Sequence, residues 1–198
     1  MLKQIIGVVL AVLLGVGGAW FVAGFLSPDE TLSQAPLPLP KGGDFTLQAV
    51  QGAVSLSDFQ GKVVVLYFGY TACPDICPTS MATLKAALAQ LTPVELSQTQ
   101  GLFVSVDPER DTLEHIQRYV GYFHPSLIGV SGSQAELLEI TRRYNAFYRK
   151  VEVPGSAMAY TIDHSAILYV IDKDGQVREQ VQHAVPPAEL AAAIRRHL

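Results

Sequence analysis

The sequence is poor in cysteine and in charge. Only two of its 198 residues are cysteines, charged residues make up 16% of the chain, and the formal net charge is −4. It has no basic stripe of the kind that nucleic-acid-binding proteins need, so we expect no nucleic-acid partner. The single pair of thiols leaves three uses open: a structural disulfide, a redox couple or a metal site.

Charge is absent from the apolar run Ile5 to Leu26. As a helix this run would extend roughly 33 Å, which is enough to cross a bilayer. A cleaved signal peptide is the competing interpretation, but its apolar region is usually about 7–15 residues long. The run also ends without an A-x-A site and without a cysteine that could take a lipid. We therefore expect a single uncleaved transmembrane helix.

The residues around this helix predict its orientation. Lys3 precedes it, whereas Asp29 and Glu30 follow it, so the positive-inside rule places the N-terminus in the cytoplasm. The proline-rich stretch that comes next favours an extended linker. We expect a cytoplasmic arm (1–4), a transmembrane anchor (5–26), a linker (27–43) and a folded domain (44–198). The protein would lie in a bacterial inner membrane with this domain in the periplasm.

Strand and helix patterns alternate along residues 44–198. Continuous β-branched and aromatic runs indicate strands buried on both faces, and the turns Gln51–Gly52 and Asp174–Gly175 indicate hairpins. The expected strands are 45–50, 53–59, 62–70, 102–107, 166–172 and 176–181. The expected helices follow Cys77, the capping pair Asp111 and Glu114, the pair Ser133 and Glu136, and Pro186–Pro187. This order predicts an α/β fold, a thioredoxin-like mixed sheet flanked by helices, with an N-terminal hairpin.

Cys73 and Cys77 stand in the stretch GYTACPDICPTS, residues 69–80, between an expected strand and an expected helix. Pro78 fits the first helical turn, which places Cys77 at or beside the N-cap. Helix-terminal N–H groups and the helix dipole then favour thiolates, so we expect both sulfurs to be accessible and activated. A disulfide across three intervening residues would stabilise the fold little, which disfavours a purely structural bridge.

A third candidate ligand lies far along the chain. Thioredoxin-type oxidoreductases place a proline loop opposite the disulfide, but the corresponding segment 159–170 has no proline and contains Asp163–His164. We expect His164 to face the two sulfurs. Two thiolates and one imidazole suit Cu(I) and can also hold Cu(II), whereas structural zinc usually takes four protein ligands. Met158 is a further candidate ligand, and the other histidines are expected to be ordinary residues (His115, His124, His183 and His197).

Three motifs, in this order behind the expected anchor, resemble a known family. They are YTACPDICP (70–78), SVDPERDT (105–112) and DHSAILYVID (163–172). The chain is similar to the SCO/SenC family of copper-binding cytochrome c oxidase assembly proteins over roughly residues 38–198. The resemblance implies a thioredoxin-like domain with an inserted hairpin and copper bound by Cys73, Cys77 and His164. It also implies delivery of copper to the binuclear copper site of oxidase subunit II.

Polar residues beside these motifs have two interpretations. Asp107, Arg110 and Asp111 either form a charge-assisted network that fixes the loop beside the site or serve only in a turn and a cap. We favour the network and do not count these residues as ligands. Asp163 is a candidate for orienting His164 or the partner.

Three functions use a strand–cysteine–helix element. The leading hypothesis is a membrane-anchored copper metallochaperone in which Cys73, Cys77 and His164 bind copper and pass it to subunit II. The alternative is an enzyme, a thiol–disulfide oxidoreductase whose redox-active pair Cys73 and Cys77 reduces the acceptor's cysteines. A periplasmic thiol reductase or copper donor is a further expected partner, because the thiols must be kept reduced. A peroxiredoxin is the third candidate, but its P-x-x-x-T-x-x-C pattern precedes neither cysteine.

Overall fold

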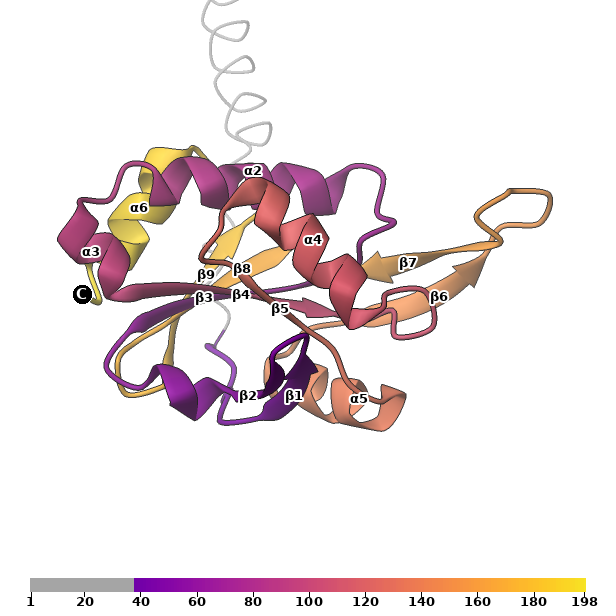
Figure 1. Ribbon diagram of the computed structural model, residues 1–198, viewed down its shortest axis with the longest axis horizontal. Coiled ribbons are helices and arrows are strands. Elements are labelled where there is room, and N and C mark those ends of the chain that lie inside the picture. Colours follow the sequence, from indigo (N-terminus) through magenta and orange to yellow (C-terminus); the bar gives the residue numbers. More distant parts are fainter. Residues whose placement is uncertain (1–37) are drawn as a thin grey trace, which may run out of the picture. The chain divides into compact units, whose positions relative to one another are not determined.

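The computed structural model describes residues 38–198, and a mixed five-stranded sheet forms their centre (Figure 1). The strand order is β5-β4-β3-β8-β9. Strands β3, β4 and β5 are parallel, whereas β8 is antiparallel to both β3 and β9. The five strands are β3 (Val63–Gly69), β4 (Thr99–Ser105), β5 (Ile128–Val130), β8 (Ile167–Ile171) and β9 (Val177–Gln182). Every residue of β3 and β4 is buried, as their continuous apolar runs predict.

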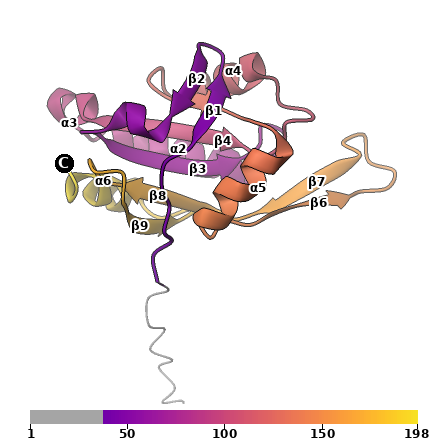
Figure 2. The same ribbon diagram turned by 90° about the horizontal axis from the view of Figure 1, so that it is seen from below.

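Both faces of the sheet are covered (Figures 1 and 2). One face carries the helices α2 (Ile76–Leu88), α4 (Leu113–Phe123) and α6 (Pro187–Arg195). The other carries the expected N-terminal hairpin, β1 (Thr46–Ala49) and β2 (Gly52–Ser55), with the 3₁₀ helix η1 (Leu56–Phe59) and α5 (Gln134–Arg143). The predicted N-terminal hairpin and the four predicted helices are therefore present.

Alternation along β3 separates the two layers. The ring of Phe68 meets Tyr144 and Tyr169 edge to face, with centroids 5.7 and 5.8 Å apart, on the face that α5 covers. Tyr67 points to the opposite face, where its hydroxyl contacts the sulfur of Cys77 on α2. The central strand thus packs the core on one side and reaches the cysteine pair on the other.

A separate two-stranded ribbon extends beyond the main sheet (Figure 1). It consists of β6 (Tyr148–Glu152) and β7 (Tyr160–His164), paired antiparallel with Tyr148 opposite His164. We call it the β6–β7 hairpin; it matches the inserted hairpin that the family resemblance implies. Its strands were not predicted individually, because β6 mixes charged and apolar residues without a clear alternation.

Two local predictions need correction, and one short helix was not predicted. The expected strand 53–59 ends at Ser55, and its last four residues form η1, where the Asp58 carboxylate accepts from the Ser55 N–H. Asp111 does not cap α4; Thr112 is the N-cap, and its side chain accepts a hydrogen bond from the backbone N–H of His115. Helix α5 begins with the predicted capping box of Ser133 and Glu136 and ends at Arg143. The short helix α3 (Pro93–Ser97) was not predicted, since its five residues are too few to show a helical period.

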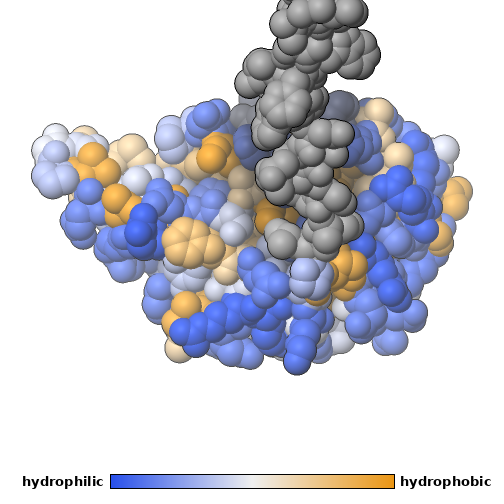
Figure 3. Space-filling view, turned by 180° about the vertical axis from the view of Figure 1, so that it is seen from behind, coloured by the Kyte–Doolittle hydropathy of each residue, from blue (hydrophilic) through white to orange (hydrophobic). Residues whose placement is uncertain are grey.

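The surface of the described residues is mainly polar on the face that Figure 3 draws. Apolar side chains are dispersed over this face. Among residues 38–198, no helix is both long and apolar enough to cross a membrane. The expected arm (1–4), the expected anchor (5–26) and most of the expected linker (27–43) lie outside the described residues.

Candidate metal centre

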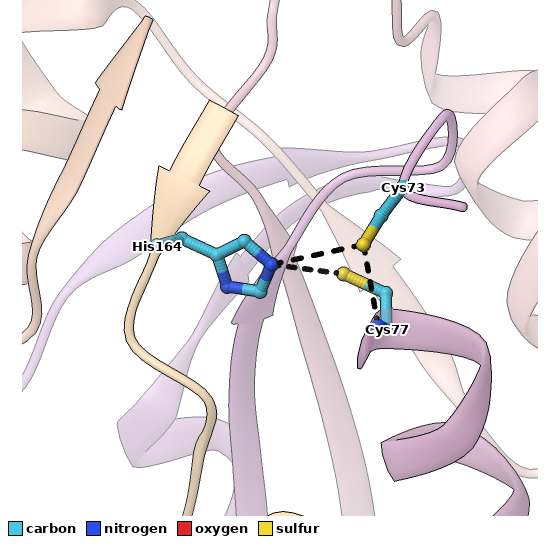
Figure 4. A group of neighbouring side chains, drawn as sticks. All are labelled: Cys73, Cys77 and His164. Carbon is cyan, nitrogen blue, oxygen red and sulfur yellow. Dashed lines mark hydrogen bonds between the residues drawn. The ribbon is translucent and has the colours of Figure 1, made fainter. Parts of the chain in front are cut away.

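The side chains of Cys73, Cys77 and His164 converge at one end of the sheet (Figure 4). Their candidate ligand atoms all lie within 4.8 Å of one another. The Nε2 atom of His164 is 3.3 Å from the sulfur of Cys77 and 3.9 Å from that of Cys73. Both thiols are free. The predicted meeting of the histidine with the two cysteines is therefore present in the fold.

Cys77 is the buried member of the group. It is the second residue of α2, whose N-cap is Asp75, and its side chain is fully enclosed. The sulfur lies against Gly69 of β3, where an added Cβ would come within 2.8 Å of it. The hydroxyl of Tyr67 donates a weak hydrogen bond to this sulfur across 3.9 Å. Packing against β3 and the backbone at the start of α2 thus fix the position of Cys77.

Cys73 is the more accessible member of the pair. It lies in the loop before α2 and is partly exposed. The backbone N–H of Cys77 donates to its sulfur across 3.4 Å. A hydrogen bond from the Cys77 thiol and hydrogen bonds from the backbone lower the pKa of Cys73 well below that of an ordinary thiol, although burial opposes this.

Burial acts in the opposite direction on Cys77. It raises the pKa of the Cys77 thiol above the ordinary value, and the neighbouring Cys73 raises it further. The expectation that both sulfurs are accessible and activated is therefore wrong for Cys77. The physical reason is that the first turn of α2 lies on the sheet, which removes this sulfur from water. The metal-free pair consists of one activated thiol and one neutral, enclosed thiol.

His164 ends strand β7 and presents Nε2 to both sulfurs (Figure 4). Its Nδ1–H donates to the backbone carbonyl of Ser165 across 3.1 Å, which leaves the Nε2 lone pair directed at the cysteines. The rings of Tyr67 and Tyr70 stand edge to face against the imidazole, at centroid distances of 6.1 and 5.7 Å. One hydrogen bond and edge-to-face contacts with two tyrosine rings therefore hold the imidazole in place.

The centre opens to solvent on one side. A hollow of about 310 Å³ is lined by Cys73, by the start of α2 and by the β7 segment that ends at His164. Within the described residues, these three side chains form the one cluster of His, Cys, Asp and Glu that could hold a metal ion. Two sulfurs and one imidazole nitrogen make a soft donor set, of the kind that binds Cu(I). Because the site opens on one side, a fourth ligand from another molecule can reach a bound ion.

Two further candidate residues lie elsewhere. Met158 belongs to the turn of the β6–β7 hairpin, six residues before His164, and its side chain is 40% exposed. At about 3.3 Å per strand residue, the length of β7 separates it from the centre. Asp163 pairs with Arg149 across the hairpin at 2.8 Å and does not orient His164; the carbonyl of Ser165 does so instead.

The other histidines have unrelated surroundings. His124 interacts with Ser126, and His197 with Glu179, both far from either cysteine in sequence. His115 and His183 join no metal-capable cluster among residues 38–198. The prediction that these four are ordinary residues agrees with the structure.

Several residues of the centre escaped the sequence analysis. Tyr67 and Gly69 belong to β3, which was recognised only as a buried run, and Tyr70 follows it directly. Their positions within reach of Cys77 and His164 follow from the alternation of β3, a signal that could have identified Tyr67 and Gly69. Ser165 acts through its backbone carbonyl, which every residue type has, so the sequence could not indicate this role.

Known proteins resemble this chain over most of its length. The family model of SCO1/SenC matches residues 33–198. The mitochondrial SCO2 homolog of Bos taurus is 35% identical over 193 residues, which cover 93% of this chain and 71% of that protein. Apo Sco1 of Thermus thermophilus is 41% identical, with a TM-score of 0.73, over 80% of this chain and 92% of that one. Copper-bound ScoI of Bradyrhizobium japonicum is 36% identical, with a TM-score of 0.71, over 80% and 99% of the two chains. The predicted thioredoxin-like α/β fold is shared with these Sco structures.

Proposed function

The chain belongs to the SCO1/SenC family, and we propose that it is a membrane-anchored copper metallochaperone. One observation carries the proposal: Cys73, Cys77 and His164 converge within 4.8 Å. A solved relative with the same overall fold holds copper. Copper is here the cargo, bound by two thiolates and the Nε2 atom of His164.

Two cysteines of unequal exposure suit an ion that must be both held and released. Cys77 is enclosed by β3 and α2 and serves as the fixed ligand. Cys73 faces the open hollow. There a ligand of the acceptor can approach the ion and replace Cys73 before it replaces Cys77. Binding releases the proton of the Cys77 thiol, so copper uptake weakens as the pH falls. His164 completes the site and leaves it with one open side.

The acceptor in this proposal is the binuclear copper site of cytochrome c oxidase subunit II, as the family resemblance implies. The anchor at residues 5–26 would hold the domain on the periplasmic side of a bacterial inner membrane, near a membrane-embedded oxidase. A periplasmic thiol reductase keeps Cys73 and Cys77 reduced, and a copper donor supplies the ion.

A second candidate function rests on the same two sulfurs. Cys73 is partly exposed and has a lowered pKa, whereas Cys77 is enclosed beside it, which resembles a nucleophile with its resolving partner. The Cys73 thiolate would attack an acceptor disulfide and form a mixed disulfide, releasing one acceptor thiolate. Cys77 would then lose its proton to the released acceptor thiolate and attack the Cys73 sulfur, which frees the second acceptor sulfur and leaves a Cys73–Cys77 disulfide. This thiol–disulfide exchange has no evident need for His164.

Copper titration of the reduced full-length chain tests the proposal. We expect one Cu(I) per chain in a chelator competition, and weaker binding in Cys73→Ser, Cys77→Ser and His164→Ala. His124→Ala is a matched control, because this histidine interacts with Ser126 outside the centre. If His164→Ala bound both Cu(I) and Cu(II) as tightly as the wild type, the proposed site would be wrong. Retained disulfide exchange with subunit II in the same variant would favour the second function.

A further inference from the structure

The turn that follows β4, residues 107–111, lies against both halves of the metal centre without hydrogen-bonding to its candidate ligands. We call these residues the 107–111 turn. On one side they hold the loop that carries Cys73. On the other side they hold the strand that carries His164.

The loop that carries Cys73 is held by the carboxylate of Asp111, a residue that is only 4% exposed. One oxygen accepts hydrogen bonds from the Thr71 backbone N–H at 2.9 Å and from the Ser105 hydroxyl at 2.5 Å. The other oxygen accepts from the Thr71 hydroxyl at 2.5 Å. Thr71 precedes Cys73 by two residues, so a buried charge with three donors fixes the loop where it leaves β3.

Strand β7, which carries His164, is held by the guanidinium of Arg110. Its Nε donates to Asp107 at 2.5 Å, and its Nη1 donates to the backbone carbonyl of Tyr160 at 2.9 Å. The same guanidinium lies 3.6 Å from the centre of the Tyr160 ring, in a cation–π contact. The Tyr160 hydroxyl donates to Asp107 across 2.7 Å. Tyr160 begins β7, and His164 ends it.

From these contacts we infer that the 107–111 turn is a positioning bridge that sets the distance between the cysteine sulfurs and the His164 imidazole. A two-stranded hairpin is marginally stable alone, so the place of His164 depends on what ties β7 to the body of the domain. Arg110 and Asp107 supply the charged part of that attachment, and Asp111 fixes the loop opposite. Both sets of contacts come from one five-residue segment, so the cysteine loop and β7 are attached to the same part of the domain.

The inference rests on the proposed metal site, but its main test needs no metal. Arg110→Gln removes the charge and the cation–π contact at β7. In the reduced, copper-free full-length chain we expect amide hydrogen exchange in Thr161–Ser165 to quicken by roughly tenfold or more, the effect of losing a hydrogen bond to a charged group. Exchange in residues 71–73 should not change. Arg149→Gln is the matched control, an exposed hairpin arginine that pairs only with Asp163.

Asp111→Asn is the reciprocal variant, because an amide cannot accept all three hydrogen bonds that the carboxylate accepts. We expect exchange in residues 71–73 to quicken by roughly tenfold or more, with Thr161–Ser165 unchanged. Asp172→Asn is the control, since this carboxylate is also largely buried and also accepts several hydrogen bonds, from the backbone N–H groups of Asp174 and Gln176 and from Arg178, but in the β8–β9 turn. A purely stabilising role would quicken exchange throughout the domain in both variants, and that uniform result would overturn the inference.

Copper then provides the second measurement. Loss of a residue that orients metal ligands typically weakens binding by roughly 10–100-fold, and we expect this for Cu(I) in both Arg110→Gln and Asp111→Asn but in neither control. Wild-type affinity in both variants would overturn the inference. If the wild-type chain itself bound no copper, the proposed function would fail, and the exchange measurements would still decide whether the 107–111 turn is a bridge.

Discussion

The cysteine half and the histidine half of the centre are built in different ways. Cys77 is enclosed between β3 and α2, among residues with almost no exposure. His164 ends a hairpin whose outer strand is mostly exposed, and polar side chains hold that hairpin to the domain. Close packing fixes the first half, whereas a few directed hydrogen bonds fix the second.

In the proposed function the site takes up an ion and gives it away, and the difference between the two halves would separate these two tasks. Shifting a packed sulfur requires the movement of many neighbours, so Cys77 keeps its place whether or not an ion is bound. Moving His164 requires the loss of only a few polar contacts. We therefore expect the histidine half, together with the accessible Cys73, to open first when an acceptor draws the ion out.

The largest expected effect is the contrast between the two thiols. In the reduced, metal-free chain, iodoacetamide should alkylate Cys73 on the order of 100-fold or more faster than Cys77, because Cys77 must wait for local opening. Quenched time points analysed by peptide mass spectrometry measure both rates. Equal rates would show that α2 and β3 do not enclose the Cys77 sulfur. The cysteine half would then be no more closely packed than the histidine half.

The next effect tests the packing of the cysteine half. In Gly69→Ala the new Cβ would lie 2.8 Å from the Cys77 sulfur and 2.9 Å from a Tyr67 ring carbon. Such overpacking typically costs about 1–3 kcal/mol, and we expect this loss in urea unfolding. Gly121→Ala on α4 is the control, because its Cβ meets no atom within 4 Å and alanine favours the helix. A neutral Gly69→Ala would mean that the strand can yield beneath Cys77.

A smaller effect tests a direct tie between the halves. The Tyr70 hydroxyl interacts with the Thr161 hydroxyl at 2.9 Å and accepts from the Ile162 N–H at 3.4 Å. Tyr70→Phe keeps the ring against His164 and removes these bonds, at a cost of about 0.5–1.5 kcal/mol. We expect that loss as faster amide exchange confined to β7. Tyr122→Phe, at a tyrosine that is 80% exposed, should change nothing.

The smallest effect lies outside both halves and serves as a baseline. Arg195 donates to Glu95 at 2.9 Å, and this hydrogen bond lowers the pKa of Glu95 from 4.5 to about 2. A pKa lowered by folding stabilises the fold above about pH 4.5, and this contribution is lost as the pH falls through about 2. Glu95→Gln should therefore lower the urea midpoint slightly at pH 7 but not near pH 2, without altering exchange in β7. An equal deficit at both pH values would mean that the ion pair is not its cause.

Much of the fold was predictable because its central elements have strong local signals. The buried run that became β3, the Asp174–Gly175 turn and the capping box at Ser133 were each placed correctly, whereas β4 was recognised but begins three residues before its predicted range 102–107. The β6–β7 hairpin was not, since its charged and apolar residues do not alternate cleanly and its contacts are made with the distant 107–111 turn. The expectation that Asp111 caps a helix failed for a related reason. Its carboxylate is used by Thr71, which is 40 residues away in sequence.

The sequence by itself determined which side chains are available: two cysteines beside a helix start, and a histidine where thioredoxin-type proteins have a proline. It also identified the family, because ordered motifs require no coordinates. Only the tertiary structure decided that Cys77 is enclosed while Cys73 is accessible, and that the 107–111 turn touches both halves. Burial and long-range hydrogen bonds arise when segments far apart in the chain pack together, so no local pattern of residues can specify them.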